Sequence, residues 1–348
     1  MKNILVTGGC GFIGSNFVKI ILKDEPEYFP VILDSLTYAG NENNLNSLDS
    51  NSYDFIKGNI CDEALVSELF EKYNFDGVFH FAAESHVDRS IDGPGAFINT
   101  NIIGTYTLLE ISRKYFKKNN SGFKFIHVST DEVYGALDDE GYFSETTPYD
   151  PSSPYSASKA SSDHIARAWY RTFELPVIVT NCSNNYGPMQ FPEKLIPLMI
   201  INCLGLKDLP VYGDGQNVRD WLFVDDHCNA IKKIYDSGVI GETYNIGGNN
   251  EIKNIDIVNT VCSILDDLKP KEDGKSYSAQ IKFVKDRPGH DYRYAINAEK
   301  IQKELNWFPY ESFETGIKKT IMWYLENETW WRMIQNKTYE QERLGENI

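Results

Sequence analysis

Short apolar runs rich in β-branched residues alternate with longer helical stretches through the first half of the chain. The runs lie at residues 4–6, 31–33, 53–56, 78–81, 125–128 and 177–180. Between them, apolar residues recur with helical spacing at 12–22, 62–72, 95–115 and 155–173. Consecutive parallel strands need a crossover, which is usually a helix. The alternation therefore predicts an α/β fold built on a doubly wound parallel sheet.

The alternation of strands and long helices ends after about residue 184. Beyond it, turn-rich segments such as YGPMQFPEK, VYGDGQN and DRPGHD separate shorter elements. A chain of 348 residues also exceeds the roughly 250–300 at which a single core stops growing. We therefore predict a first lobe of residues 1–190, to which 218–250 return. Residues 191–348 mainly form a smaller mixed α/β lobe, which ends in one long aromatic helix over about 311–335.

The composition excludes several classes of partner. The net charge is −16 without any basic block, which argues against nucleic acid or an anionic membrane. The six cysteines show no CxxC spacing, and no apolar run approaches the ~18 residues that span a bilayer. The chain opens on MKNILVTGG, without a signal-peptide pattern. We expect a cytoplasmic protein with reduced thiols and no metal site.

A glycine-rich turn follows the first predicted strand and opens a helix, in the sequence TGGCGFIG. Gly8, Gly11 and Gly14 allow unusual backbone angles and a close approach of the peptide to a pyrophosphate at the helix N-terminus. The pattern indicates a Rossmann-type dinucleotide site, although a tight structural turn is the alternative. Asp34 ends the second strand, where a carboxylate accepts from ribose hydroxyls and favours NAD over NADP. The alternative for Asp34 is a simple cap.

Further residues fall where a bound dinucleotide lies in an open α/β sheet, at the carboxyl ends of the strands. Those that follow the third and fourth predicted strands are Asn59, Ile60, Phe81, Ala82 and Ala83. The predicted cofactor site also includes Phe12, Ile13, Thr37 and Thr100.

Tyr155 and Lys159 lie four residues apart at the start of a predicted helix, in YSASK, and hence on one face. A tyrosine with a reference pKa of about 10 is a poor base, but we expect Lys159 and a positive nicotinamide ring to favour the phenolate. Such a pair takes a proton from an alcohol while a hydride leaves for NAD. An isolated surface pair is the alternative.

Two adjacent acids, Asp131 and Glu132, follow a predicted buried strand in STDEVYG. Consecutive strand residues point to opposite faces. Both carboxyls therefore meet one substrate only if the chain leaves extended geometry at about Asp131. The alternative is a pair that caps a loop in water.

Several motifs together resemble the extended short-chain dehydrogenases/reductases and, within them, the dTDP-glucose 4,6-dehydratases. These motifs are TGGCGFIG, FHFAAESHVDRS, STDEVYG, YSASK, NNYGPMQFPEKLIP, VRDWLFVDDHC and DRPGHD. The resemblance implies NAD as cofactor, and a homodimer through the helices at roughly 95–115 and 155–173. It also implies that Thr130 hydrogen-bonds the oxygen on carbon 4 of the sugar. Asp131 is then the acid at the 6-hydroxyl, and Glu132 the base at carbon 5, roles suited to two carboxyls that share one proton.

The second lobe should bind the sugar nucleotide. Arginine donates in bidentate fashion to a diphosphate, so Arg219 of VRDW is the best candidate, with a surface ion pair as the alternative. The resemblance adds residues that line the nucleotide or reach the sugar or phosphate. They are Ser85, Asn184, Lys194, Leu195, Pro210, Tyr212, Asn254, Arg287, His290 and Tyr292. The choice between dTDP and UDP, and the roles of His86, Cys182 and Met189, stay open.

The resemblance implies an NAD-dependent hydro-lyase that acts on a dTDP-glucose-like sugar nucleotide. Oxidation at carbon 4, loss of water across carbons 5 and 6 and hydride return to carbon 6 give a 4-keto-6-deoxy product, a precursor of rhamnose-type deoxysugars. A sugar-nucleotide 4-epimerase of the same fold is the nearer alternative, and Asp131 and Glu132 argue against it. A non-catalytic NAD-binding regulator is the more distant alternative, since a mere binder has no need of Tyr155 and Lys159.

Overall fold

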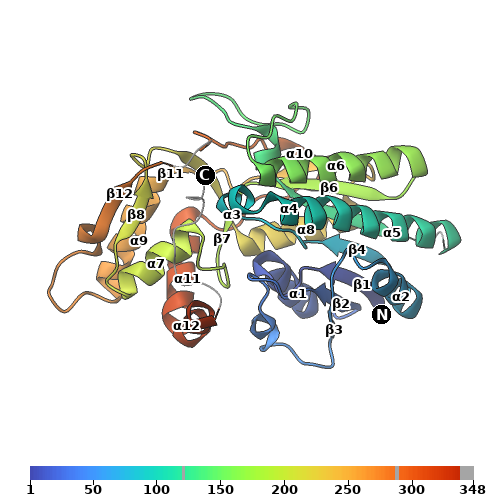
Figure 1. The fold of residues 1–348 in the computed structure, drawn as a ribbon, viewed down its shortest axis with the longest axis horizontal. Helices are drawn as coiled ribbons and strands as arrows, with labels where there is room; N and C mark the ends of the chain where they lie inside the picture. Colours follow the sequence, from blue (N-terminus) through green and yellow to red (C-terminus); the bar gives the residue numbers. More distant parts are fainter. Residues whose placement is uncertain (120–121, 287–289, 338–348) are drawn as a thin grey trace.

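A seven-stranded parallel sheet forms the centre of the molecule. The structure is a computed structural model that describes residues 1–119, 122–286 and 290–337 (Figure 1). The strands are β1 (Lys2–Thr7), β2 (Tyr28–Asp34), β3 (Asp54–Lys57), β4 (Gly77–His80), β5 (Lys124–Thr130), β6 (Val177–Cys182) and β10 (Thr243–Ile246). Their order is β10-β6-β5-β4-β1-β2-β3, and every neighbouring pair is parallel. The sheet grows outward in both directions from β1, so the predicted doubly wound fold is confirmed.

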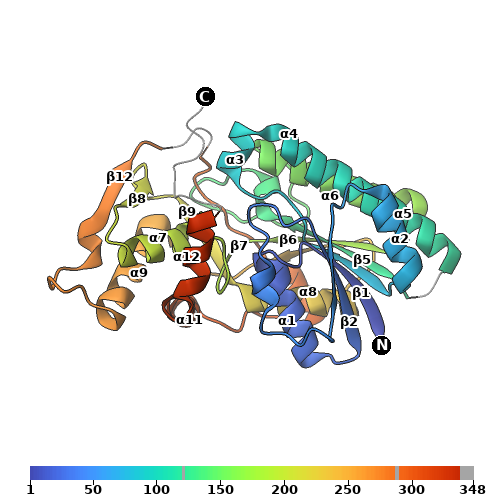
Figure 2. The ribbon, with the colours of Figure 1, turned by 60° about the horizontal axis from the view of Figure 1, so that its bottom comes forward.

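Helices cover both faces of this sheet (Figure 2). One face packs against α1 (Phe12–Asp24), α8 (Val224–Ser237) and α10 (Glu299–Leu305). The other packs against α2 (Glu63–Tyr73), α5 (Thr105–Asn119) and α6 (Pro154–Phe173). The strands therefore bury side chains on both faces and read as nearly continuous apolar runs.

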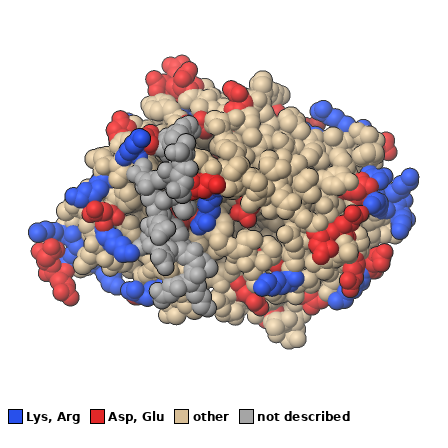
Figure 3. Space-filling view, viewed as in Figure 1, with Lys and Arg blue, Asp and Glu red and all other residues tan. Residues whose placement is uncertain are grey.

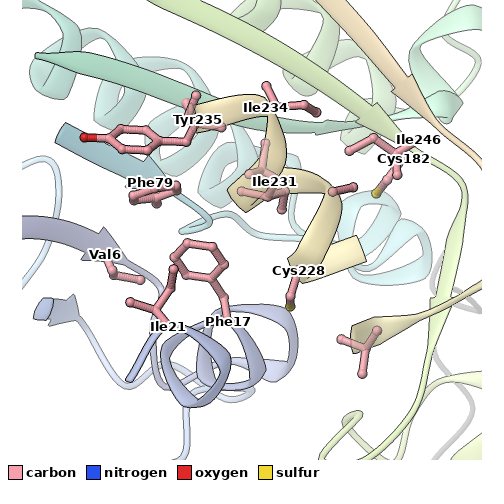
Figure 4. Packing of buried hydrophobic residues seen from close by; sticks show 14 of the residues in the cluster. Val6, Phe17, Ile21, Phe79, Cys182, Cys228, Ile231, Ile234, Tyr235 and Ile246 are labelled. Carbon is pink, nitrogen blue, oxygen red and sulfur yellow. The ribbon is translucent and has the colours of Figure 1, made fainter. Parts of the chain in front are cut away.

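Aromatic rings fill the core between α1, α8 and the sheet (Figure 4). The rings of Phe17 and Phe79 lie 4.5 Å apart, and those of Phe79 and Tyr235 lie 4.7 Å apart. Phe17 is fully buried on the helix that follows the glycine-rich turn. This packing fixes the direction in which the N-terminus of α1 points.

A second, smaller lobe lies beside the sheet, on the left in Figure 1. Its strands are β7 (Asn184–Tyr186), β8 (Leu209–Tyr212), β9 (Val218–Phe223), β11 (Glu251–Lys253) and β12 (Ile281–Val284). Its helices are α7 (Leu195–Leu204), α9 (Asn254–Leu268), α11 (Phe313–Glu326) and α12 (Glu328–Lys337). They enclose a separate apolar core around Tyr186, Met199, Ile257 and Tyr324.

The two cores agree in outline with the proposed division of the chain into lobes, which stays a prediction. However, β7 of the stretch 1–190 and β9 of the stretch 218–250 pair with each other in the smaller lobe. Elements α8 and β10, from the stretch 218–250, return to the layers of the first sheet. Element α10 joins the same core, although it lies beyond that stretch.

Two predicted helices are interrupted. The stretch predicted at 95–115 consists of α4 (Pro94–Phe97), a π-helix (Ile98–Gly104) and α5. The C-terminal helix is two helices, α11 and α12, separated at Asn327, whose φ of −113° is not helical. The bend turns α12 back toward the first lobe, where the indole nitrogen of Trp330 donates to Asn44 Oδ1 at 2.8 Å. These long-range contacts override the local helical pattern.

None of the helices in the described part of the chain combines the length and the apolar character needed to cross a membrane.

We expect Phe17→Ala to lower the free energy of unfolding by roughly 3–5 kcal/mol, because a fully buried ring leaves a cavity. Phe308→Ala is the matched control, since its ring is 58% exposed, and it should cost far less. Urea unfolding followed by tryptophan fluorescence measures both values. Equal losses would contradict the assignment of Phe17 to the core.

Candidate active site

The glycine-rich turn holds the backbone of β1 and α1 against the end of β4. Gly8 has a φ of +71°, and a Cβ there would lie 2.7 Å from the Ala82 nitrogen. A Cβ on Gly14 would lie 2.3 Å from the Gly8 oxygen. Only glycine fits at both positions, and the N-terminus of α1 consequently opens onto a cavity of about 310 Å³. This cradle fits a pyrophosphate at a helix N-terminus.

All the residues predicted to bind the cofactor line this cavity. Besides the glycines of the turn they are Phe12, Ile13, Asp34, Thr37, Asn59, Ile60, Phe81, Ala82, Ala83, Thr100, Tyr155 and Lys159. The Asp34 carboxylate is fixed by two backbone donors, Cys10 N–H at 2.9 Å and Leu36 N–H at 2.8 Å. A carboxylate has about four lone-pair sites, so Asp34 keeps acceptor capacity for a ribose diol. The residues present therefore fit NAD.

Asn101, on the π-helix, links two parts of this site through its side chain. Its side chain accepts from Glu84 N–H at 2.9 Å and donates to Glu84 O at 3.0 Å. It also donates to Ser158 Oγ at 2.8 Å, on α6. The widened turn thus ties the loop after β4 to the helix that carries Tyr155, and π-turns often occur at functional sites.

Tyr155 and Lys159 enter the cavity from the first turns of α6. A reciprocal capping box between Ser153 and Ser156 fixes the start of this helix. Lys159 Nζ donates to Val128 O at 2.8 Å. Burial lowers the pKa of Lys159, and the nearby Asp163 acts against this shift. The pair therefore lies on one face of α6, as predicted.

The surroundings of Tyr155 differ from the expectation. Burial and the negative charge of Glu132 raise the pKa of Tyr155 well above its ordinary value. The ammonium of Lys159 is held by a β5 carbonyl and does not reverse this effect. The chain's own groups consequently keep the phenol protonated.

The strand β5 ends at Thr130, and a short 3₁₀ helix begins at Asp131 (Asp131–Tyr134). The predicted break in extended geometry is thereby confirmed. Thr130 Oγ1 accepts from Glu132 N–H at 3.3 Å and lies 3.3 Å from Asp131 Oδ1. Both carboxyls line the same cavity as Tyr155.

Asp131 is buried to 2% exposure. Its Oδ2 makes no hydrogen bond within the described residues. Burial, followed by the charges of Glu132 and Asp220, raises the pKa of Asp131 well above its ordinary value. A carboxyl of this kind stays protonated at a pH at which an exposed aspartate is ionised, and it can therefore act as an acid.

A second cavity of about 270 Å³ continues from the first into the smaller lobe. Ser85, Glu132, Asn184 and Lys194 line both cavities. The other predicted substrate residues in the second cavity are Leu195, Pro210, Tyr212, Arg219, Asn254 and His290. The cavities therefore form one path from the dinucleotide cradle to the second lobe.

Backbone carbonyls orient Arg219 in this second cavity. Its guanidinium donates to Val218 O at 2.7 Å, Tyr292 O at 3.1 Å and Asp291 O at 2.8 Å. Tyr292 thus contributes its carbonyl, whereas its side chain is 44% exposed. Of the predicted substrate residues that the structure describes, Tyr292 alone lies outside both cavities. Arg287 lies outside the described residues.

Several residues that line the cavities are not among those predicted from the sequence. Asn185, Gln190 and Glu193 line both cavities, and Trp221 lines the second. Cys182, whose role was open, lines the first cavity, and its thiol donates to Ser129 O at 3.4 Å. The three polar residues lie within NNYGPMQFPEK, a turn-rich segment that is also part of the motif NNYGPMQFPEKLIP, and this motif was the signal that could have found them. Within the described residues, no cluster of three or more His, Cys, Asp or Glu side chains has the geometry to hold a metal.

Comparisons with known proteins agree with this geometry. Residues 5–320 match the family model described as GDP-mannose 4,6 dehydratase. A dTDP-glucose 4,6-dehydratase of Xanthomonas campestris pv. campestris is 55% identical over 354 residues, which cover 100% of both chains.

Two solved structures resemble the chain closely. The dTDP-glucose 4,6-dehydratase of Bacillus anthracis in complex with NAD is 49% identical, with a TM-score of 0.86 and coverage of 96% of this chain and 100% of that one. The enzyme of the same name from Streptomyces venezuelae, also with NAD bound, is 45% identical, with a TM-score of 0.88 and coverage of 95% and 99%. The chain therefore belongs to the dTDP-glucose 4,6-dehydratases, a family of extended short-chain dehydrogenases/reductases.

Proposed function

We propose that this chain uses NAD to convert dTDP-glucose into dTDP-4-keto-6-deoxyglucose with loss of water. The observation that carries the proposal is the pair Asp131 and Glu132, which opens on one cavity together with Tyr155 and Lys159. The fold alone does not decide the reaction, because one fold hosts many activities. An epimerase has no need of the two carboxyls, whereas elimination needs both an acid and a base.

Each residue of the site then has a step that it can perform. Tyr155 takes the proton of the 4-hydroxyl, and Thr130 hydrogen-bonds the oxygen on carbon 4. NAD, held by the Gly8–Gly14 turn and Asp34, would supply a hydride acceptor for carbon 4 and a hydride donor for carbon 6. Glu132 removes the proton from carbon 5, which the neighbouring ketone acidifies, and returns a proton to carbon 5 when the hydride reaches carbon 6.

Asp131 protonates the departing 6-hydroxyl, a role that its raised pKa favours. The positive nicotinamide ring acts against the raised pKa of Tyr155, because a nearby positive charge favours the phenolate.

The substrate path gives the second lobe its role. We assign the nucleotide diphosphate to the second cavity, near Arg219, and the hexosyl ring to the junction of the two cavities. The division into an NAD-binding lobe (1–190, with 218–250) and a mainly sugar-nucleotide-binding lobe (191–348) follows from this assignment.

We also propose a cytoplasmic location. All six cysteines are free thiols, and five of them are buried. Free thiols persist in a reducing compartment.

A homodimer is the proposed assembly, through the outer face of α5, α6 and the π-helix. Ile98, Ile103, Tyr106 and Phe173 are between 44% and 49% exposed there. Figure 3 shows few charged side chains over the central part of this face, whereas charges gather toward the ends of the molecule. An apolar, weakly charged patch of this kind marks a protein interface.

Glu132→Gln should retain NAD and dTDP-glucose binding but lose at least about 100-fold in kcat, because it removes the base at carbon 5. Mass spectrometry of the product checks the reaction, since the wild-type chain should remove one water from dTDP-glucose. Glu140→Gln, in an exposed loop, is the matched control and should retain full activity.

Full turnover by Glu132→Gln would contradict the assignment of Glu132 as the base at carbon 5. A wild-type product of unchanged mass would instead favour epimerisation. UDP-glucose in a parallel incubation tests the choice of nucleotide.

Asp131→Asn should raise the Tm at pH 8 by about 2–4 °C, the size of roughly 1 kcal/mol in a large domain. Because the pKa of Asp131 is higher in the folded than in the unfolded chain, the wild type loses stability as pH rises from about 4 through the raised pKa. The gain of the variant should therefore shrink toward pH 4. Thermal scans at both pH values measure it, with the exposed Asp138→Asn as control. A gain that grows toward pH 4 would contradict the raised pKa.

Ile103→Lys should shift the assembly from dimer to monomer, because a charge in the centre of an apolar interface is left desolvated. Sedimentation velocity measures the mass. Val239→Lys, in the loop after α8, places the same charge at a residue that is 54% exposed and should leave the dimer intact. A monomeric wild-type chain would refute the proposed assembly.

A further inference from the structure

Gln190 occupies the junction of the two cavities. It lies in the segment between β7 and α7, is 7% exposed and lines both spaces. It is not among the residues to which the mechanism above gives a role. A buried polar side chain at this junction therefore needs its own explanation.

Hydrogen bonding fixes the orientation of the Gln190 amide. Its Nε2 donates to the Asn185 carbonyl oxygen at 2.8 Å. Because a carbonyl oxygen only accepts, the amide cannot be turned the other way round. Its Oε1 is buried and has no hydrogen-bond partner among the described residues. Gln190 thus holds one oriented, buried acceptor that lacks a donor within the described part of the chain.

The backbone of this segment is also held in place. Tyr324 OH, from α11, donates to the Gln190 carbonyl oxygen. Asn16 Nδ2, from α1, donates to Pro188 O at 3.0 Å. Met189 has a φ of +66°, a strained value for a residue with a side chain. Such strain persists only where the surroundings enforce it, and it often occurs at functional sites.

We propose that Gln190 Oε1 accepts a hydrogen bond from the 2- or 3-hydroxyl of the hexosyl ring and so selects the substrate. The inference rests on the proposed function, which places the ring at the junction of the cavities. The oxygen on carbon 4 is engaged by Thr130 and Tyr155, and that on carbon 6 by Asp131. The 2- and 3-hydroxyls are the ring donors that remain. Gln190 thus fixes the ring orientation that presents carbons 4 and 5 to their partners.

Deoxy analogues of the substrate, combined with variants of Gln190, test this contact. A site built to bond a hydroxyl strongly rejects an analogue that lacks it, because its buried acceptor is left unpaired. With the wild-type chain, either the 2-deoxy or the 3-deoxy analogue of dTDP-glucose should lose at least about 10-fold in kcat/KM and in affinity by calorimetry. In Gln190→Met the same analogue should lose less than about 3-fold, since the two changes remove one interaction.

Two further variants separate this contact from a structural effect. Gln190→Glu keeps an acceptor oxygen at the same position and should keep the discrimination, which provides a readout if the methionine variant does not fold. Gln302→Met, on α10 and outside both cavities, should behave as the wild type. Discrimination that is unchanged in Gln190→Met would overturn the proposal. A loss of NAD affinity with unchanged discrimination would also overturn it, because the oxygen would then serve the cofactor's carboxamide.

The calorimetric arm does not depend on turnover. If the wild-type chain discriminates against the deoxy analogue in binding but removes no water, the proposed function fails while the Gln190 contact stands. If the wild-type chain removes water from dTDP-glucose but binds the deoxy analogues as tightly as dTDP-glucose, the proposed function stands and the Gln190 contact fails.

Discussion

The chemistry of this site depends on the point at which β5 ends. A strand that continued past Thr130 would direct Asp131 and Glu132 to opposite faces of the sheet. The 3₁₀ helix that begins at Asp131 prevents this, and the Thr130 hydroxyl holds the turn by accepting from Glu132 N–H. The Thr130 side chain thus stabilises the local geometry and also lines the first cavity. Asp131, Glu132 and Tyr155 line one cavity because of this turn.

This arrangement places unfavourable charges together in a buried site. Burial and mutual repulsion raise the pKa of Asp131 and of Tyr155, so the ionised forms destabilise the folded chain. The negative charge of Asp163 partly offsets the lowering of the Lys159 pKa by burial. Asp163 Oδ1 also lies 3.0 Å from His127 Nε2, within hydrogen-bond distance. Active sites commonly trade stability for shifted pKa values in this way.

Short-range sequence patterns predicted much of the fold and of the candidate site. The sheet, the glycine turn and the Tyr155–Lys159 spacing each depend on residues close in sequence. The π-helix at 98–104 and the break at Asn327 depend instead on partners such as Glu84 and Asn44, which no local periodicity reveals. Gln190 could not be predicted for the same reason. It is a candidate site residue because it lines both cavities, and these form only in the folded chain.

The segment that carries Gln190 also couples the two lobes. Glu193 accepts from Arg89 Nε at 2.9 Å and from Tyr38 OH at 3.0 Å, and the Arg89 guanidinium lies 3.8 Å from the centre of the Tyr38 ring. Tyr38 belongs to the loop after β2 that borders the first cavity, whereas Glu193 immediately precedes Lys194, a predicted substrate residue. The Glu193 side chain is almost fully buried, so water screens this ion pair less than a surface pair. This buried contact therefore links the loop beside the first cavity to the segment that lines both cavities.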